Sequence, residues 1–411
     1  MNRDNRSSLK TKVMQLLDGN ARRNRGYYYT APSRRKYPHQ WSWDSAFHAI
    51  VNCRLGRTKL AEEETATLLN CMTPDGRLPH LIMHERNLRS IPDRILRLYW
   101  KPAGRSQIIQ PPVVALAVRE IGETGKDPHF ISWALPLLER HFEWIRDARC
   151  SGDSGLASIL SPWESGLDHK PGFDCMLGIF AKVPAGLHFA LNLLDIEIAL
   201  RSPGGRKPID AARFNVREVL FNTLYALGLE ALSRLFFEKG DKEKGQFYYQ
   251  RYKEVEKAIL EECYDASSGL YYDIDARTGK QIREPGISCL MPLVLENISK
   301  DRSDALVQHL TNTDEYWLNF PVPSVPANSP HFEPMHKYYL WRGSTWMNTN
   351  WLIVMGLRKH GYESLADEIA VKSIELVERS GFREYYNPLT GEGGGEKDFG
   401  WSTLAAVMQD S

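Results

Sequence analysis

Apolar residues recur every three to four positions along most of this chain of 411 residues, and this helical period constrains the fold most. One such stripe is Tyr248, Tyr252, Val255 and Ile259, whose spacing places all four on one helix face. Segments of the same kind cover residues 8–19, 44–55, 58–72, 112–123, 129–147, 185–201, 220–231, 303–311, 347–359, 363–379 and 399–409. Alternation with a period of two is scarce, and residues 271–275 are the best strand candidate. The sequence therefore predicts an all-α protein of about twelve helices.

Helices in this number can stack as a solenoid of helix pairs or close into a double ring. A solenoid would show a repeat of roughly 30–45 residues, and the sequence has no such self-similarity. The connecting loops are long, irregular and rich in aromatic residues, as expected at the end of a closed barrel that carries a site. No low-complexity linker divides the chain. We therefore expect one domain, residues 1–411, folded as a toroid with an active-site face built from long loops.

The near-equal numbers of basic and acidic residues argue against nucleic acid as a partner. The chain has 52 basic and 51 acidic residues, so it lacks the basic excess of a general nucleic-acid binder. No run approaches the roughly 18 apolar residues of a membrane span, and the first residues lead into an amphipathic segment rather than a signal-peptide core. The six cysteines include no C-x-x-C pair and are expected to be reduced. We expect a cytoplasmic protein that binds neither nucleic acid nor membrane.

The aromatic content indicates either a large core or a ligand pocket. The chain has 11 Trp and 18 Tyr, and many of them lie in Gly/Pro-rich stretches. Flat, partly polar faces suit a ring-shaped polar ligand. In residues 37–45, Tyr37, Trp41 and Trp43 stand close to Asp44. That carboxylate could cap the following helix, contact a ligand, or do both.

Two acids stand four residues apart in the loop 161–171. Glu164 and Asp168 follow Trp163 within a stretch that also contains glycine and two prolines. They could be surface acids of an ordinary polar loop. Alternatively, one of them is a general acid placed against an aromatic wall, where desolvation raises the pKa of a carboxyl group.

Two further loops lie near the C-terminal end. Residues 340–351 contain Trp341, Arg342 and Trp346, and the guanidinium could orient a carboxylate or a sugar hydroxyl, or form a structural salt bridge. Residues 382–402 contain a glycine run and four carboxylates, including Glu384 and Glu396. The run lacks G-x-x-x-x-G-K-[ST], and its acids would repel phosphate. The pattern therefore favours carbohydrate chemistry over nucleotide binding.

Metal and nucleophile signatures are weak. His80 and His84 have the i, i+4 spacing of a zinc pair, but they do not form H-E-x-x-H and no third ligand is indicated. No G-x-S-x-G elbow is present, which argues against an α/β-hydrolase. We expect no metal and no organic cofactor.

Three motifs resemble the inverting glycosidases of glycoside hydrolase family 63. Residues 163–168 (WESGLD) resemble W-E-S-G-x-D, a form of which also occurs in the related trehalases of family 37. Residues 341–346 (WRGSTW) resemble W-R-G-P-x-W. Residues 384–387 (EYYN), 393–396 (GGGE) and 399–402 (FGWS) resemble the family's C-terminal pattern. The matches follow in the family's order from about residue 27 to 404, and together they are specific.

The resemblance implies an (α/α)6 barrel that hydrolyses O-glycosyl bonds with inversion. By position, Asp168 corresponds to the general acid and Glu384 to the general base that activates water. Glu396 then corresponds to a supporting or ligand-binding carboxylate. The residues alone leave the choice among Glu384, Glu392 and Glu396 open. An inverting enzyme needs one acid and one base with room for a water between them, and no cofactor.

Residues 27–33 (YYYTAPS) and 37–44 (YPHQWSWD) resemble the bacterial mannosylglycerate and glucosylglycerate hydrolases most, and the chain has about the length of one barrel, as those enzymes do. The resemblance implies a small soluble α-glycoside, glucosylglycerate or mannosylglycerate, as the substrate. Arg206 corresponds most closely to an arginine that meets the glycerate carboxylate, although it could equally belong to a solvated basic loop. The other candidate substrate-binding residues are Tyr37, Gln40, Trp41, Trp43, Asp44, Gln110, Trp163, Gly166, Trp341, Arg342, Trp346, Glu396 and Trp401.

The chain departs from the family pattern at several positions. Leu340 and Ser344 replace the usual Tyr and Pro around W-R-G, and residues 169–171 (HKP) replace Asn-Ser-Pro. Lys170 could favour an anionic leaving group or point to solvent. One alternative is therefore a trehalase-like hydrolase of a neutral di- or oligosaccharide. More distant ones are a sugar epimerase or lyase on a similar toroid and a non-catalytic sugar-binding protein. A homo-oligomer remains possible.

Overall fold

A computed structural model describes residues 3–24, 26–85, 94, 100, 102–125, 127–152, 154–201 and 212–410. The α-helices are α1 (Arg3–Asn20), α2 (Ser42–Arg54), α3 (Thr58–Leu69), α5 (Val114–Gly125), α6 (Pro128–Arg149), α7 (Asp174–Leu177), α8 (Pro184–Arg201), α9 (Val219–Glu238), α10 (Lys242–Glu262), α11 (Lys300–Leu310), α12 (Met347–Lys359) and α13 (Glu363–Ser380). The 3-10 helices are η1 (Pro162–Ser165), η2 (Pro171–Phe173), η3 (Gly178–Lys182), η5 (Ile287–Val294), η6 (Gly400–Ala406) and η7 (Met408–Asp410).

The strands are short and pair antiparallel. They are β1 (Ala21–Asn24), β2 (Tyr27–Thr30), β3 (Gln40–Trp41), β4 (Leu81–Ile82), β5 (Val216–Arg217), β6 (Tyr264–Asp265), β7 (Leu270–Tyr271), β8 (Asp273–Asp275), β9 (Lys280–Ile282), β10 (Arg383–Tyr386) and β11 (Gly393–Lys397). The pairs are β1 with β2, β3 with β4, β6 with β7 and β10 with β11, and one sheet of three strands has the order β5-β8-β9.

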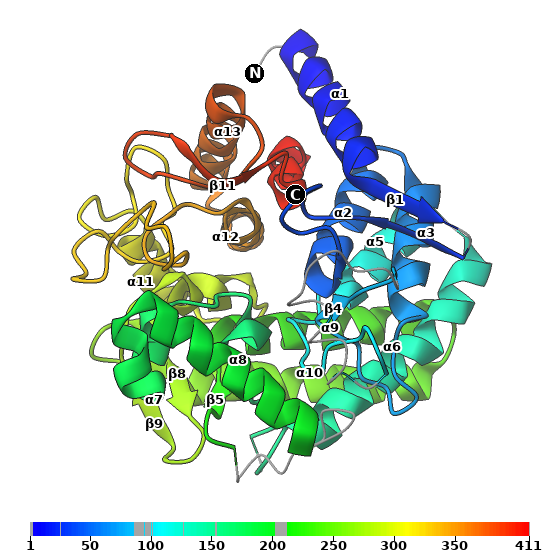
Figure 1. Cartoon of the computed structure of the whole chain (residues 1–411), viewed down its shortest axis with the longest axis horizontal. Helices are drawn as coiled ribbons and strands as arrows, with labels where there is room; N and C mark the ends of the chain where they lie inside the picture. Colours follow the sequence, from blue (N-terminus) through cyan, green and yellow to red (C-terminus); the bar gives the residue numbers. More distant parts are fainter. Residues whose placement is uncertain are drawn as a thin grey trace.

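Six helical elements close an inner ring. Each of α2, α5, α9, η5, α12 and η6 packs against the next, and η6 packs back against α2. An outer element covers each position: α3 packs on α2, α6 and α10 on α9, α11 on η5, α13 on α12 and α1 on η6. α6 also packs on α5. The fold is the predicted (α/α)6 barrel, and Figure 1 looks along it.

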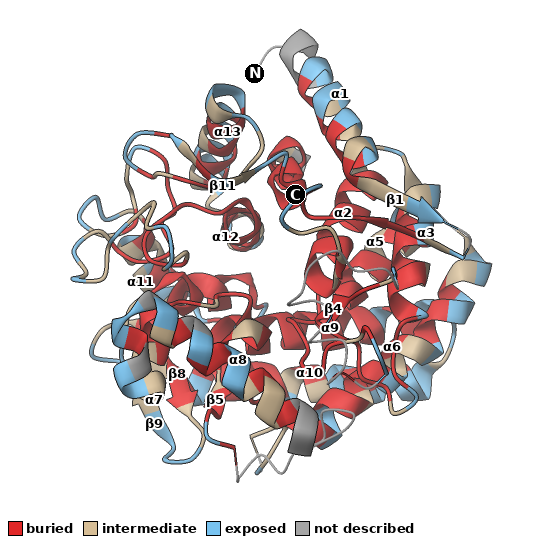
Figure 2. Cartoon of the chain, viewed as in Figure 1, coloured by how far each residue is buried: buried red, intermediate tan, exposed pale blue. Residues whose placement is uncertain are grey.

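The distribution of apolar residues around each helix explains which helices lie in the inner ring and which in the outer ring. Helix α9 is apolar on nearly every face and is buried almost throughout, whereas the outer helix α10 buries a stripe that includes Tyr248, Tyr252, Val255 and Ile259. A helix that is hydrophobic all round has to lie inside, and an amphipathic one can face water. Figure 2 shows the same contrast between the buried inner helices and the half-exposed outer ones. One buried core cluster runs from Leu9 to Met408.

The structure departs from the predicted helices in two places. Residues 399–409 form the 3-10 helices η6 and η7 rather than an α-helix, and residues 287–294 form η5. In η6 the Thr403 hydroxyl donates to the Gly400 carbonyl at 2.6 Å, and the Ser402 hydroxyl donates to the Arg383 carbonyl. Hydroxyl groups that bond to the backbone compete with the α-helical pattern, and 3-10 turns tolerate them. The strand candidate at 271–275 is present as parts of β7 and β8 on either side of Tyr272.

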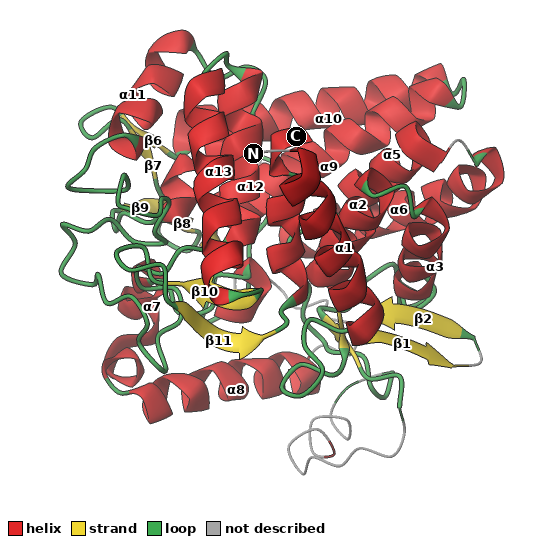
Figure 3. Ribbon diagram, turned by 90° about the horizontal axis from the view of Figure 1, so that it is seen from above, coloured by secondary structure: helices red, strands yellow, loops and turns green. Residues whose placement is uncertain are grey.

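Helix α8 and the strand pairs β1–β2 and β10–β11 lie at one end of the ring, as Figure 3 shows from above. The loops that precede α2, α7, α12 and η6 contain the aromatic and acidic motifs. Along the parts of the chain that the structure describes, no helix has the length and hydrophobicity needed to cross a bilayer.

Candidate active site

One pocket with a cavity volume of about 70 Å³ collects most of the predicted site residues. Its lining includes Tyr37, Trp41, Trp43, Asp44, Gln110, Gly166, Asp168, Trp341, Trp346, Glu384 and Trp401. Pro32, His80, Leu340 and Phe399 also line it. The barrel therefore brings together loops that lie more than 300 residues apart in the sequence, from Tyr37 to Trp401.

Stacked and crossed indole rings form one side of the pocket. Trp341 and Trp346 stack with their ring centres 3.8 Å apart, and Trp401 meets Trp346 edge-on at 5.6 Å. Trp43 lies opposite Gly166, where an added Cβ would come within 2.4 Å of the indole. Gly166 also has a φ of 75°, which side chains rarely adopt. A glycine at 166 is therefore needed both by the backbone and by the ring that faces it.

Asp168 follows η1 on a loop and is partly exposed to the pocket. Burial of its carboxyl, together with the negative charges of Glu384 and Asp44, raises its pKa from 3.8 to about 7. A carboxyl group with this pKa keeps its proton at near-neutral pH and can donate it.

Glu384 lies on β10 and is buried. The Tyr37 hydroxyl donates to its Oε1 at 2.8 Å, and the Glu396 backbone N–H donates to its Oε2 at 2.9 Å. The ammonium of Lys36 lies 3.8 Å from Oε2. The Trp401 indole N–H donates to the Glu384 backbone carbonyl at 3.0 Å, which fixes the strand beneath the carboxylate. These contacts hold the carboxylate as an oriented acceptor.

Several polar atoms around the pocket are buried without a protein partner. They include Asp44 Oδ1, Trp41 Nε1, Trp346 Nε1 and His80 Nδ1. Asp44 lies in the first turn of α2, whose N-cap is Trp41 without any side-chain cap bond. Burial raises the pKa of Asp44 to about 7 and lowers that of His80 to about 3. Since buried polar groups are normally satisfied, a polyhydroxylated ligand would complete this set.

Some predicted residues lie outside the pocket lining. Nη2 of Arg342 donates to both carboxylate oxygens of Asp174 at 2.6 and 2.8 Å, and its Nε donates to the His169 carbonyl at 3.1 Å. The Gln40 amide donates to the Ser45 hydroxyl at 3.1 Å. Glu396 contributes its backbone N–H to Glu384. Arg206 lies outside the described residues.

An outer chamber with a cavity volume of about 340 Å³ adjoins the pocket and shares Tyr37, Trp41, His80, Asp168 and Leu340 with it. Trp163 lines this chamber rather than the pocket. The chamber also contains residues that we did not predict, namely Lys36, Leu81, Trp100, Ile108, His169, Asp195, Lys337 and Tyr338. His169 directly follows the motif of residues 163–168 and Lys36 precedes Tyr37, but Trp100, Ile108 and Asp195 lie outside every motif, so no local signal could have identified those three.

The two histidines of the i, i+4 pair have different surroundings. His80 meets the edge of Trp41 at 4.6 Å, whereas His84 stacks on Tyr27 at 4.5 Å and contacts Gln40 at 2.7 Å. Across the described residues, no group of three or more His, Cys, Asp or Glu side chains could hold a metal ion.

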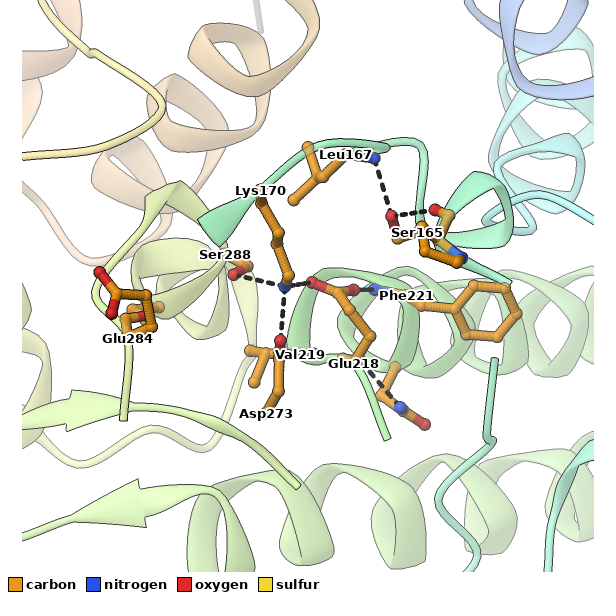
Figure 4. A network of polar contacts seen from close by, with 12 residues as sticks. Ser165, Leu167, Lys170, Glu218, Val219, Phe221, Asp273, Glu284 and Ser288 are labelled. Carbon is orange, nitrogen blue, oxygen red and sulfur yellow. Dashed lines mark hydrogen bonds and ion pairs between the residues drawn. The ribbon is translucent and has the colours of Figure 1, made fainter. Parts of the chain in front are cut away.

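Lys170 takes neither of the two positions considered from the sequence. Its side chain is buried, and its ammonium contacts Glu218 at 2.5 Å and Asp273 at 2.7 Å (Figure 4). It therefore neither points to solvent nor lies among the described residues that line the pocket or the outer chamber. Its two acidic partners could not be foreseen, because they lie 48 and more residues away.

Comparison with known proteins identifies relatives along nearly the whole chain. A family model described as "Mannosylglycerate hydrolase MGH1-like glycoside hydrolase domain" matches residues 37–402. The mannosylglycerate hydrolase of Thermus thermophilus is 31% identical over 438 aligned positions, which cover 97% of this chain and 99% of that protein. The glucosylglycerate hydrolase of Mycolicibacterium hassiacum is 26% identical, with 90% and 91% covered.

Solved structures agree with these relatives. The crystal structure of a GH63 mannosylglycerate hydrolase from Thermus thermophilus in complex with Tris and D-glycerate has a TM-score of 0.86 and 30% identity, and the match covers 98% of this chain and 100% of that one. Neutral trehalase from Saccharomyces cerevisiae has a TM-score of 0.63 and 17% identity over 93% of this chain and 73% of its own. The second likeness shows a shared fold.

Proposed function

Because this chain belongs to the mannosylglycerate hydrolase MGH1-like glycoside hydrolases, we propose that it hydrolyses a small α-glycoside of glycerate, the mannoside or the glucoside, with inversion at the anomeric carbon. The observation that supports this most is the pairing of two unlike carboxyl groups in one pocket. Asp168 has a pKa raised to about 7, and Glu384 is an acceptor held by two hydrogen bonds.

In the proposed reaction Asp168 is the general acid and Glu384 the general base. The Asp168 proton moves to the glycosidic oxygen as the bond from that oxygen to the anomeric carbon breaks. Glu384 takes a proton from a water whose oxygen bonds to the anomeric carbon from the opposite face. The free sugar has the inverted configuration, and glycerate leaves as an alcohol. Solvent then returns the proton to Asp168 and removes the one on Glu384.

The sugar ring would occupy the pocket and the leaving group the outer chamber. In the pocket, the indole faces of Trp341 and Trp346 offer a flat wall, and the unpaired Asp44 Oδ1 offers an acceptor for a hydroxyl group. Asp168 lines both spaces, as expected for a residue that protonates the oxygen between sugar and leaving group.

The charge of the outer chamber supports an anionic leaving group. Lys36 and Lys337 both line the chamber, and either ammonium could pair with a carboxylate. This favours glycerate over the neutral leaving group of a trehalase-like substrate. We retain Arg206 as a proposed third cation for that carboxylate.

The first experiment is proton NMR of the anomeric region during incubation with mannosylglycerate, glucosylglycerate, trehalose and maltose. Release of the β-sugar from a glycerate α-glycoside would support the proposal and name the sugar. Release of glucose from trehalose or maltose alone would favour the neutral-substrate hydrolase.

Two substitutions test the catalytic roles. Asp168→Asn and Glu384→Gln should each abolish turnover on a folded protein, since general acid–base catalysis contributes about 10²–10⁴-fold per group. Near-normal turnover in either variant would remove that residue from the mechanism.

The leaving-group assignment has its own test. Lys337→Met should raise KM for the glycerate glycoside several-fold, about tenfold if one charged hydrogen bond is lost. The KM for an uncharged glycoside of the same sugar serves as the control and should change little. Lys36 is a less selective probe because its ammonium also lies beside Glu384.

We propose a cytoplasmic location as well. All six cysteines are free in the structure, which suits a reducing compartment. Cell fractionation would test this location.

We also propose a homo-oligomer. The exposed apolar side chains of Phe189 and Leu193 on α8 support it, and light scattering of the purified chain would test it.

A further inference from the structure

Lys170 lies two residues after Asp168 and anchors that part of the loop to the barrel. Its ammonium contacts Glu218 Oε1 at 2.5 Å, Asp273 Oδ2 at 2.7 Å and the Ser288 hydroxyl at 3.1 Å (Figure 4). The three partners come from three separate elements. Glu218 immediately precedes α9, Asp273 begins β8 and Ser288 lies in η5.

The two carboxylates are fixed from their other side. Glu218 Oε2 accepts the Phe221 N–H at 2.5 Å, and Asp273 Oδ1 accepts the Val219 N–H at 3.0 Å. Both bonds come from the first turn of α9, an inner-ring helix. The ammonium of Lys170 is therefore tied to the rigid frame of the barrel rather than to another loop.

Burying this cluster costs more free energy than burying apolar side chains of the same volume. Two carboxylates and one ammonium are buried together, and such groups lose more hydration than a hydrophobic set of the same volume. Burial lowers the pKa of Lys170, but the Asp273 and Glu218 charges outweigh it, so the pKa lies above its ordinary value and the side chain stays charged. Buried ionic contacts of this kind contribute a defined geometry more than stability.

A tight turn connects Lys170 to Asp168, so the position of Lys170 affects the position of Asp168. The Lys170 backbone N–H donates to the Leu167 carbonyl at 2.9 Å, so Asp168 lies inside a turn that Leu167 opens and Lys170 closes. At its start, the Leu167 N–H donates to the Ser165 hydroxyl at 2.9 Å. Upstream, Glu164 is held by Arg149 at 2.9 Å. The turn is thus pinned before and after Asp168.

We propose that Lys170 is a positioning residue for the general acid: through Glu218 and Asp273 it fixes the turn that presents the Asp168 carboxyl to the glycosidic oxygen. This inference rests on the proposed function. Lys170 acts through Asp168, because neither the pocket nor the outer chamber has Lys170 among its described lining residues.

The test compares two leaving groups. An α-glycosyl fluoride loses fluoride without needing a proton from an enzymic acid, whereas a glycoside whose leaving group is an alcohol needs one. In Lys170→Met, kcat for the best glycoside of the NMR panel should fall by about 10²-fold, the cost of a misplacement near 1 Å. Hydrolysis of the α-fluoride of the same sugar should change by less than about threefold, and KM for both should stay close to wild type.

Two further variants separate positioning from folding. Lys170→Met leaves two buried carboxylates with no cation, so Lys170→Met/Glu218→Gln removes one charge while the amide oxygen can still accept the Phe221 N–H. It should show the same selective loss. Ser288→Ala removes only the neutral partner and should give a smaller loss in the same direction, about two- to fivefold. If the first two variants fail to fold, Ser288→Ala decides the question.

The matched control is Lys253→Met. Lys253 also pairs with a buried glutamate, Glu256 at 3.0 Å, but on α10, in the outer ring. It should leave both substrates unaffected. Equal losses on glycoside and fluoride in a folded Lys170 or Ser288 variant, or no loss on either, would overturn the positioning role. A wild-type protein that hydrolyses neither glycosides nor fluorides would refute the proposed function instead, so the two failures are distinguishable.

Discussion

Asp168→Asn should stabilise the protein, and the gain should depend on pH. The Asp168 carboxyl has a pKa of about 7 in the folded chain against 3.8 ordinarily. Below about pH 4 both the folded and unfolded states are protonated, so the group contributes nothing. Between about pH 4 and 7 the unfolded state releases the proton and the folded state keeps it. The free energy of unfolding then falls by about 1.4 kcal/mol per pH unit.

Above pH 7 the free energy of unfolding is lowered by the full cost of burying the ionised Asp168 carboxylate. Three pH units correspond to about 4 kcal/mol, and because solvent reaches the carboxyl through the pocket we expect about 2–4 kcal/mol. Asparagine has nearly the same shape and no charge to bury, so it avoids this cost at every pH. The predicted sign is a more stable variant at pH 8 and little difference at pH 4.

Urea unfolding of wild type and Asp168→Asn at pH 4, 6 and 8 measures the effect directly. The control is Asp314→Asn, an exposed aspartate whose replacement should change the free energy of unfolding by less than about 0.5 kcal/mol at each pH. A gain of the same size at pH 4 and pH 8 would mean that packing, not ionisation, is responsible. A loss of stability at pH 8 would refute the reasoning outright.

The remaining predictions concern activity and packing. The kcat/KM of the wild type should fall about tenfold per pH unit above pH 7, because only protonated Asp168 can donate; a profile flat to pH 9 would contradict this. Gly166→Ala should lower the free energy of unfolding by about 2 kcal/mol or more in thermal melts, since its Cβ would lie 2.4 Å from the Trp43 ring, and an unchanged melting temperature would show that the ring can move. Tyr37→Phe removes the donor at 2.8 Å from Glu384 and should lower kcat about tenfold with KM nearly constant; a pure KM effect in steady-state kinetics would place Tyr37 in substrate binding only.

The helical period was sufficient to predict most of the barrel. It failed where the inner ring is not α-helical. Residues 287–294 are apolar except for Ser288 and contain Pro292, so no polar face can be distinguished and no helical period can be recognised. Residues 399–409 have a plausible helical pattern, but the Ser402 and Thr403 hydroxyls bond to backbone carbonyls and favour 3-10 turns.

The site was predictable where motif and pocket coincide. Asp168 and Glu384 come from motifs, and each lines the same pocket. What could not be predicted is the direction of the long cationic side chains. Arg342 and Lys170 both lie in motif loops, yet they turn away to acidic partners, the half-buried Asp174 and the buried Glu218. Such pairings join distant segments, and a single sequence does not contain them.

Closure of the ring also sets the electrostatics of the site. Asp168 and Glu384 are 216 positions apart in the sequence, and only the return of η6 to α2 brings their loops to one pocket. Burial alone would raise the pKa of Asp168, and the charge of Glu384 raises it further in the same direction. Glu384, the proposed base, therefore helps to keep Asp168, the proposed acid, protonated. Opening the ring would separate the two carboxyl groups and lower the pKa of Asp168, so loss of barrel closure should abolish activity before the outer helices unfold.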